Sequence, residues 1–311
     1  MFPTVIIVLI ICGIELILGI TVNGLIIIVN CIEWIRNRKL TCCDMILTSL
    51  GISRFFLQFT IFINNIFFAF SMAVDGQCIT WKIVYLAWRY LNTLSLWFAT
   101  WLSVFYCVKI ANFSQPLFLW LKQRIPGLLP QLLMSSLPLS LLSCLFASDG
   151  IYVTYTDNKI NNLLGNTSME CRYKHNLCPG LVILSLFGYS FPFFIFIVPA
   201  LLLVISLWRH TKRMEKTTIS FRDTVNEAHV SAIKCISSFI FFYVSYFVVI
   251  VLFLLNIFQH SNIYFTWFIS AVTAAYPSGH SVVLILCNRK LKSATLKALK
   301  YMKCRLRGEA L

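Results

Sequence analysis

Two side chains in the apolar run 81–111, Trp88 and Asn92, are suited to holding a small organic molecule. Their spacing of four places them on one face of a helix. A large ring beside an amide offers apolar contact together with an orienting hydrogen bond. Side chains of other apolar runs that could line the same cavity are Asn65, Tyr243, Tyr246, Ser270 and Thr273. Hydrogen bonding between helices and an interfacial belt of aromatic rings remain alternative roles for all seven.

The absence of acidic residues from parts of these runs indicates the charge of the ligand. The outer halves of the second, third, fifth, sixth and seventh apolar runs contain no Asp or Glu. A receptor for cationic amines would place a buried carboxylate there. We therefore expect a mostly apolar, largely uncharged ligand.

Ionisable side chains inside apolar runs form a second set of candidates, because burying charge in a membrane is costly and usually functional. Arg54 stands about ten residues into its run, in LTSLGISRFFLQ, and needs hydrogen-bond acceptors. Asn23 and Ser281 occur at a similar depth in other runs. A purely structural clamp between helices and a clamp that rearranges during switching are both compatible with this pattern.

Three more ionisable residues, Glu15, Asp44 and Arg89, fall within the apolar runs. Asp44 and Arg89 lie near the ends of their runs, where we expect the side chains to reach water. The chain shows no cluster of a nucleophile with a base and no spacing typical of a metal site. We therefore expect neither an enzyme nor a cofactor.

The elements that position these residues are predicted by hydropathy. The 311 residues are 59% hydrophobic and only 12% charged, against about 25% charged in soluble domains. A membrane-spanning helix needs roughly 20 mostly apolar residues. Seven such runs occur, at about residues 3–31, 43–70, 81–111, 127–147, 181–208, 229–257 and 263–287. They are too long and too uniformly apolar for the alternating strands of a barrel. The sequence predicts an all-α membrane protein, a seven-transmembrane helix bundle over residues 1–287 with a short basic cytoplasmic tail, 288–311.

The distribution of positive charge predicts the orientation. With an extracellular N-terminus, most of the 26 Lys and Arg residues fall in the inner loops and the C-terminal tail. This is the bias that orients multi-pass proteins of the plasma membrane. It also explains the net charge of +15 without nucleic acid. Binding of anionic membrane lipid is the simplest role for most of these charges.

The same orientation sorts the glycosylation sequons and the cysteines. Asn166 lies in the long outer loop and is the expected glycan site, whereas Asn112 lies in an inner loop. Three cysteines, Cys78, Cys171 and Cys178, fall outside, where one pair could oxidise. Cysteines within the helices, including Cys235 and Cys287, are interpreted as small apolar packing residues.

Five motifs resemble the taste receptor type 2 family, the bitter taste receptors among G-protein-coupled receptors. The segment WFATWLSVFYCVKIANFSQPLFLWLKQRI is the most similar. The other four are NGLIIIVNCIEWIRNRKLTCCDMILTSLGISR, LLLVISLWRHTKRM, EAHVSAIKCISSFIFFY and YPSGHSVVLILCNRKLKSA. The resemblance runs nearly from end to end, and is weakest in the fourth run and the outer loops.

The resemblance implies roles for matching positions. Trp88 and Asn92 match the family's ligand-contact pair, although Thr93 follows where many members have histidine. Phe105 and Tyr106 stand where other receptors carry an Asp-Arg-Tyr switch, and His280 and Ser281 stand where they carry Asn-Pro. The family usually lacks the disulfide from its third helix to the second outer loop, yet Cys78 leaves a substitute bond open.

The expected function is sensing of bitter small molecules in an outer-half pocket and activation of a gustducin-type heterotrimeric G protein. Basic residues at the inner ends of three runs are candidates for contacting the α subunit of the G protein: Lys109, His210, Lys212, Arg213 and Lys234. Lipid-facing charge is the alternative role for them. The alternative to a receptor is a transporter. A transporter would show inverted repeats or broken helices, and neither occurs in the sequence.

Overall fold

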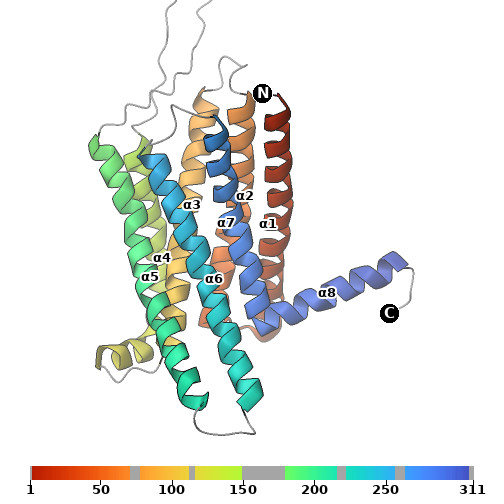
Figure 1. Cartoon of the computed structure of the whole chain (residues 1–311), viewed down its shortest axis with the longest axis vertical. Coiled ribbons are helices and arrows are strands. Elements are labelled where there is room, and N and C mark those ends of the chain that lie inside the picture. The colour runs from red at the N-terminus through yellow and green to blue at the C-terminus, as the bar shows by residue number, and fades with distance from the viewer. Residues whose placement is uncertain are drawn as a thin grey trace, which may run out of the picture.

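The computed structural model describes residues 2–70, 78–111, 116–148, 179–215, 222–255 and 263–307. This part of the chain is folded almost entirely into helices (Figure 1). The helices are α1 (Phe2–Asn37), α2 (Cys42–Phe70), α3 (Cys78–Ile110), α4 (Pro116–Ser148), α5 (Pro179–Glu215), α6 (Arg222–Leu254), α7 (Ile263–Cys287) and α8 (Arg289–Arg307).

Seven of these helices, α1 to α7, are long and apolar enough to cross a membrane, which confirms the predicted bundle. Several begin or end beyond the apolar runs. Helix α1 continues to Asn37, and α4 begins at Pro116 with a segment that lies across the inner end of the bundle (Figure 1). Hydropathy marks the part of a helix inside lipid, so it misses polar turns that extend into water.

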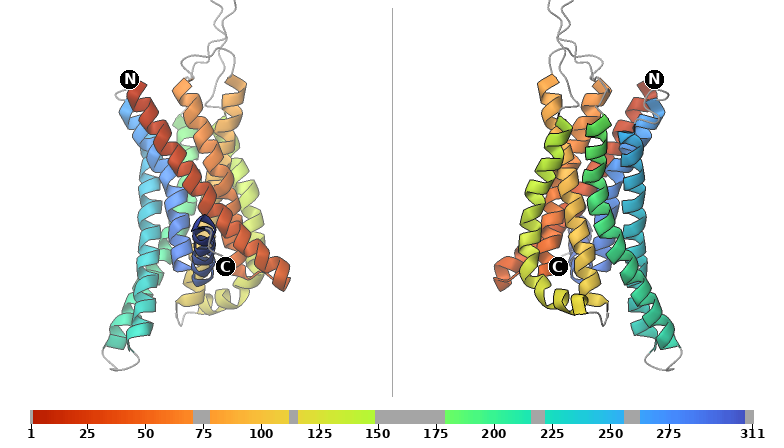
Figure 2. Two further views of the ribbon diagram at one scale, coloured as in Figure 1. Left: turned by 90° about the vertical axis from the view of Figure 1, so that its right-hand side faces the viewer. Right: turned by 90° about the vertical axis from the view of Figure 1, so that its left-hand side faces the viewer.

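Helix α3 lies at the centre of the bundle. It packs against α2, α4 and α5, while α6 lies between α5 and α7. In an apolar 18-residue stretch of α3, 72% of residues are buried, against 22% in the corresponding stretch of α1, which crosses the bundle obliquely at its edge (Figure 2). Most side chains in this part of α3 therefore face protein, whereas many isoleucines of α1, such as Ile10, Ile14 and Ile17, are exposed on the outside of the bundle.

The C-terminal tail forms α8, which leaves the inner end of α7 sideways (Figure 1). Its start is fixed by Asn288, whose Oδ1 accepts the backbone N–H groups of Lys290 and Leu291 at 3.0 and 3.3 Å. This is an N-cap, which satisfies donors that a helix start leaves free. Leu291 is fully buried against the bundle. The sequence analysis placed a basic tail here but did not predict its helix.

Candidate functional site

The guanidinium of Arg54 lies at the centre of the bundle, with no exposed surface. Its Nε donates to Ser95 Oγ on α3 at 3.1 Å, and Nη1 donates to Ser281 Oγ on α7 at 3.1 Å. Nη2 donates to the Tyr276 hydroxyl at 3.3 Å and to Nδ1 of His280. Arg54 thus joins α2 to α3 and α7, and every guanidinium nitrogen has a partner.

The predicted partners of Arg54 are only partly the observed ones. Ser281 accepts a hydrogen bond directly from Arg54. Asn23 is linked to the arginine through Ser281, whose Oγ donates to Asn23 Oδ1 at 2.8 Å. Asn23 in turn donates to the Gly19 carbonyl at 2.8 Å. The network therefore extends to α1. Sequence reasoning missed Ser95 and Tyr276, which have ordinary residue types for a helix interior.

Aromatic rings connect this network to the outer half of the bundle. The Tyr276 ring lies 4.8 Å from that of Tyr246 on α6, and the His280 ring lies 4.0 Å from that of Phe239. The Tyr246 hydroxyl accepts a short hydrogen bond from Asn92 Nδ2 on α3. Asn92, Tyr246, Tyr276 and Arg54 thus form a continuous path from the outer half to the middle of the membrane.

The other residues predicted to line a ligand cavity form two groups, one on α3 and α6 and one on α2 and α7. Trp88 is half-buried and packs against the apolar cluster of Leu57, Ile61 and Ala274, and its ring centre lies 5.6 Å from that of Tyr85 in a tilted arrangement. Tyr243 is buried against Phe196 and Tyr276.

On the side of α2 and α7, Ser270 donates a short hydrogen bond to Asn65 Oδ1. Thr273 only bonds the Ile269 carbonyl of its own helix, at 2.8 Å. The structure therefore joins Asn92 with Tyr246 and Asn65 with Ser270, as two separate bridges between helices.

The expectation that Asp44 and Arg89 reach water is wrong. Asp44 is 6% exposed and Arg89 is 3% exposed. Asp44 stands at the start of α2, where its N–H donates to Thr41 Oγ1 at 3.2 Å and its carboxylate accepts from that hydroxyl at 2.7 Å. This pair caps the helix. Arg89 lies on the inward face of α3, so proximity to a helix end does not expose it.

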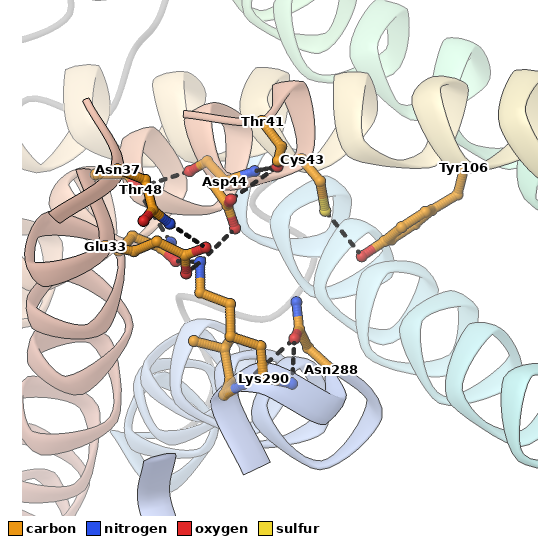
Figure 3. Close-up of polar contacts among 11 residues, drawn as sticks. Glu33, Asn37, Thr41, Cys43, Asp44, Thr48, Tyr106, Asn288 and Lys290 are labelled. Atoms are coloured by element: carbon orange, nitrogen blue, oxygen red, sulfur yellow. Dashed lines mark hydrogen bonds and ion pairs between the residues drawn. The ribbon is translucent and has the colours of Figure 1, made fainter. Parts of the chain in front are cut away.

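A lysine on α8 holds three helices together at the inner side (Figure 3). Lys290 Nζ donates to Asp44 at 2.9 Å and to Asn30 Oδ1 at 3.0 Å, and it forms a close ion pair with Glu33. Partial burial opposes the charged form, but the hydrogen bonds and charges of Glu33 and Asp44 outweigh it and raise the pKa of Lys290. The amine is therefore charged at neutral pH and fixes α8 against α1 and α2.

The predicted switch residues at the inner end of α3 point in different directions. Phe105 is buried in the main core. Tyr106 contacts α2, with its hydroxyl 3.6 Å from Cys43 Sγ (Figure 3). The structure does not bring either of them into the Arg54 network.

The basic candidates at the inner ends of helices are exposed where their side chains are described. Lys109 and Lys234 lie at the surface of α3 and α6. Lys212 on α5 is also exposed, with its amine 4.6 Å from the centre of the Trp208 ring. The side chains of His210 and Arg213 lie outside the described residues, as do Asn166 and the pairing of Cys78, Cys171 and Cys178.

Two cysteines interpreted as packing residues are paired instead. Cys235 near the inner end of α6 and Cys287 at the end of α7 form a disulfide, with Cα atoms 6.3 Å apart. Residues that are 52 apart in sequence give no spacing signal for such a bond. Only the packing of α6 against α7 brings them together.

Seven membrane-length helices, a polar and aromatic path through the bundle and a basic inner face define a G-protein-coupled receptor. The family model described as Taste receptor protein (TAS2R) matches residues 1–303. The chain is 39% identical over 280 residues to taste receptor type 2 member 2 of Homo sapiens, covering 90% of this chain and 91% of that one. It is 40% identical over 291 residues to taste receptor type 2 member 10 of Papio hamadryas, with 93% and 92% covered.

The chain therefore belongs to the taste receptor type 2 family, which is a family of G-protein-coupled receptors for bitter taste. It is a multi-pass protein of the plasma membrane that acts in sensory transduction, and it is a receptor rather than an enzyme. Binding of ligands and coupling to G proteins follow in general from this membership.

Proposed function

We propose that bitter small molecules bind in the outer half of the bundle beside Trp88 and Asn92, and that the receptor then activates a gustducin-type G protein. The observation that carries this proposal is the bond from Asn92 on α3 to Tyr246 on α6. It places an amide and a phenol among aromatic walls, beside the half-buried Trp88. Such a combination of apolar surface and few polar groups suits a small organic ligand.

The same bond suggests how binding reaches the inner side. A ligand that hydrogen-bonds the Asn92 amide replaces the bond from Asn92 to Tyr246. The Tyr246 side chain can then move, which changes the packing of α6 against Tyr276. Tyr276 and His280 both contact Arg54, and Phe239 of α6 packs on His280. A shift of α6 therefore alters the contacts of the Arg54 network, and a ligand that favours the shifted arrangement would act as a switch.

At the inner surface, α6 is the helix whose movement opens a binding site for the G protein. Three exposed lysines carry like charges at the inner ends of α3, α5 and α6, namely Lys109, Lys212 and Lys234. Separation of these helices reduces the repulsion between the charges. The cleft so formed is basic and matches carboxylates near the carboxyl end of the G-protein α chain. The Cys235–Cys287 disulfide ties α6 to α7, so movement of the inner end of α6 requires reduction of this bond, and a reducing cytoplasm favours the two free thiols.

Calcium imaging of cells that express this receptor with a gustducin-type α subunit tests the proposal. We expect at least one compound of a bitter panel to give a saturable response that requires both proteins. Cells that express only the G protein control for endogenous receptors. A receptor that reaches the surface yet responds to no compound, with this G protein or with a promiscuous one, would contradict the proposed ligand class.

A further inference from the structure

Arg89 on α3 is a buried cation whose hydrogen-bonding capacity is only partly used. It is 3% exposed, its guanidinium lies 5.4 Å from the centre of the Tyr189 ring on α5, and it hydrogen-bonds Tyr85. Two of its nitrogens, Nε and Nη2, are buried and have no hydrogen-bond partner among the described residues. The two ion pairs found among the described residues both belong to Lys290, so neither compensates this charge.

Leaving a buried charged donor without a partner is costly, and proteins rarely do so without a functional reason. The two free nitrogens lie on one edge of a planar group, which is the edge that binds a carboxylate through two parallel hydrogen bonds. Arg89 is therefore prepared for an acceptor that the described part of the chain does not supply.

Two neighbouring helices bring further unused hydroxyl groups to this level. Ser185 is one helical turn before Tyr189 on α5, and Ser140 is one turn before Cys144 on α4, whose thiol donates to the Leu86 carbonyl of α3 at 3.3 Å. Both serines are buried, at 1% and 0% exposure, and both hydroxyls lack a partner. Among the described residues, unsatisfied donors thus occur on α3 and on the two helices, α4 and α5, that pack against it.

Arg89 also lies next to the ligand cavity proposed above. It precedes Asn92 by three residues, which places the two on neighbouring positions of one helix face. Tyr189, whose ring lies under the guanidinium, is buried in the same apolar core as Tyr246, the partner of Asn92. A ligand of ordinary size that contacts Asn92 is therefore within reach of Arg89.

We propose that Arg89 forms an anion subsite of this cavity, which binds a carboxylate, sulfonate or deprotonated imide on a small bitter molecule. The inference rests on the proposed function, because it assigns a chemical class of ligand to the same cavity. It also changes the expectation from the sequence, where the lack of acidic residues indicated an uncharged ligand. Among the described residues, the side chains proposed to line the cavity include no carboxylate for an amine, whereas Arg89 offers a group for an acid.

Matched pairs of acids and neutral derivatives test this subsite. Salicylic acid with methyl salicylate, saccharin with N-methylsaccharin, and further aromatic acids with their methyl esters are applied to cells that express the full chain. We expect at least one acid to be about 10- to 100-fold more potent than its neutral partner, the effect of a charge-assisted hydrogen bond. In Arg89→Gln this preference should disappear while the neutral compounds keep their potency.

Lys82→Gln is the control, because it removes a cation from the same helix about two turns nearer the outer end. It should keep the preference for acids. If Arg89→Gln does not reach the surface, Arg89→Lys replaces it, and the loss of the planar fork should weaken acids selectively. An acid preference that survives both Arg89 variants, or one that Lys82→Gln removes equally, would overturn the subsite. Activation by neutral compounds alone would also overturn it while leaving the proposed function intact, whereas no activation by any compound would refute both.

Discussion

Arg54 and Arg89 are buried arginines on adjacent helices, with 0% and 3% of their surface exposed, yet their surroundings differ. Arg54 donates to four side chains on α3 and α7, and none of its nitrogens is left free. Arg89 has an aromatic ring and a tyrosine hydroxyl beside it, and two of its nitrogens have no partner in the described part of the chain. Arg54 is part of a completed internal network, whereas Arg89 is open to an additional group.

This difference separates two roles for charge inside a membrane protein. A fully bonded cation fixes the relative positions of helices, and removing it leaves several buried acceptors without a donor. An incompletely bonded cation contributes little to fixing helices and gains its partner when a ligand arrives. Substitutions of the fully bonded Arg54 should affect the response to every agonist. Substitutions in the outer half of the bundle, where Arg89 lies, should affect particular agonists.

Arg54→Leu should have the largest effect. The substitution leaves Ser95, Ser281, Tyr276 and His280 without their common donor, each at a cost of about 1–3 kcal/mol. We expect the chain to reach the membrane but to lose most of its maximal response, or to change its basal activity, for all agonists. Surface labelling with concentration–response curves measures both.

Ser53→Ala is the matched control for Arg54. Ser53 is similarly buried, but its hydroxyl only bonds the Leu50 carbonyl of its own helix, at 2.9 Å. It should signal normally. Normal basal activity and a normal dose response in Arg54→Leu would show that the arginine is only a packing residue.

Asn92→Ala should weaken potency without lowering surface expression. Losing one polar contact in a dry site costs about 1–3 kcal/mol, or roughly a 5- to 150-fold shift in the half-maximal concentration. Thr93→Val is the control, because the Thr93 hydroxyl bonds the Arg89 carbonyl of its own helix at 3.0 Å. Unchanged potency of Asn92→Ala for every agonist would remove this residue from the ligand site.

Lys109→Ala and His210→Ala should reduce G-protein activation at saturating agonist while ligand binding persists. Exposed ion pairs are weak individually, so we expect a maximal response lower by about half rather than abolished. Lys297→Ala, on the exposed surface of α8, serves as the control at matched surface density. Full maximal response in both variants would assign these side chains to lipid contact instead.

Lys290→Met should lower the thermal stability of the receptor slightly. Losing the contacts to Glu33 and Asp44 should reduce the melting temperature by about 2–4 °C, the shift that ~1 kcal/mol produces in domains of about 150–250 residues. The folded pKa of Lys290 is raised, so this contribution is present below the ordinary lysine pKa of about 10.4 and is lost as the pH rises through the folded value.

Thermal unfolding of the purified receptor at two pH values measures this contribution. The difference between wild type and Lys290→Met should be present near neutral pH and should shrink in strongly alkaline buffer. Lys292→Met, exposed on the same helix, should unfold like the wild type. A difference that is independent of pH would mean that the methylene groups of Lys290, rather than its charge, stabilise α8.

Asn166→Gln should have the smallest effect on signalling but a clear biochemical one. If the outer loop faces the secretory lumen, Asn166 carries a glycan and Asn112 does not. The endoglycosidase-sensitive shift on a gel should disappear in Asn166→Gln and persist in Asn112→Gln. A shift that depends on Asn112 would reverse the predicted orientation of the whole bundle.

The sequence predicted the seven helices because hydropathy depends directly on contact with lipid. It also identified Arg54 and Ser281 as partners, since a charge in the middle of a membrane needs acceptors at the same depth. It did not predict Tyr276, Ser95 or the Cys235–Cys287 bond, because those contacts depend on how the helices are rotated against each other. The burial of Asp44 and Arg89 was missed for the same reason.

Agonist-stimulated nucleotide exchange tests the central claim most directly, with purified receptor in lipid nanodiscs and a gustducin-type heterotrimer. The account predicts that a bitter agonist accelerates exchange in a saturable way. It further predicts that Asn92→Ala raises the half-maximal concentration at unchanged maximal rate, and that Arg54→Leu alters the maximal or basal rate. Exchange that no bitter compound accelerates, or an Asn92→Ala curve that coincides with the wild type while Arg54→Leu changes only the half-maximal concentration, would contradict it.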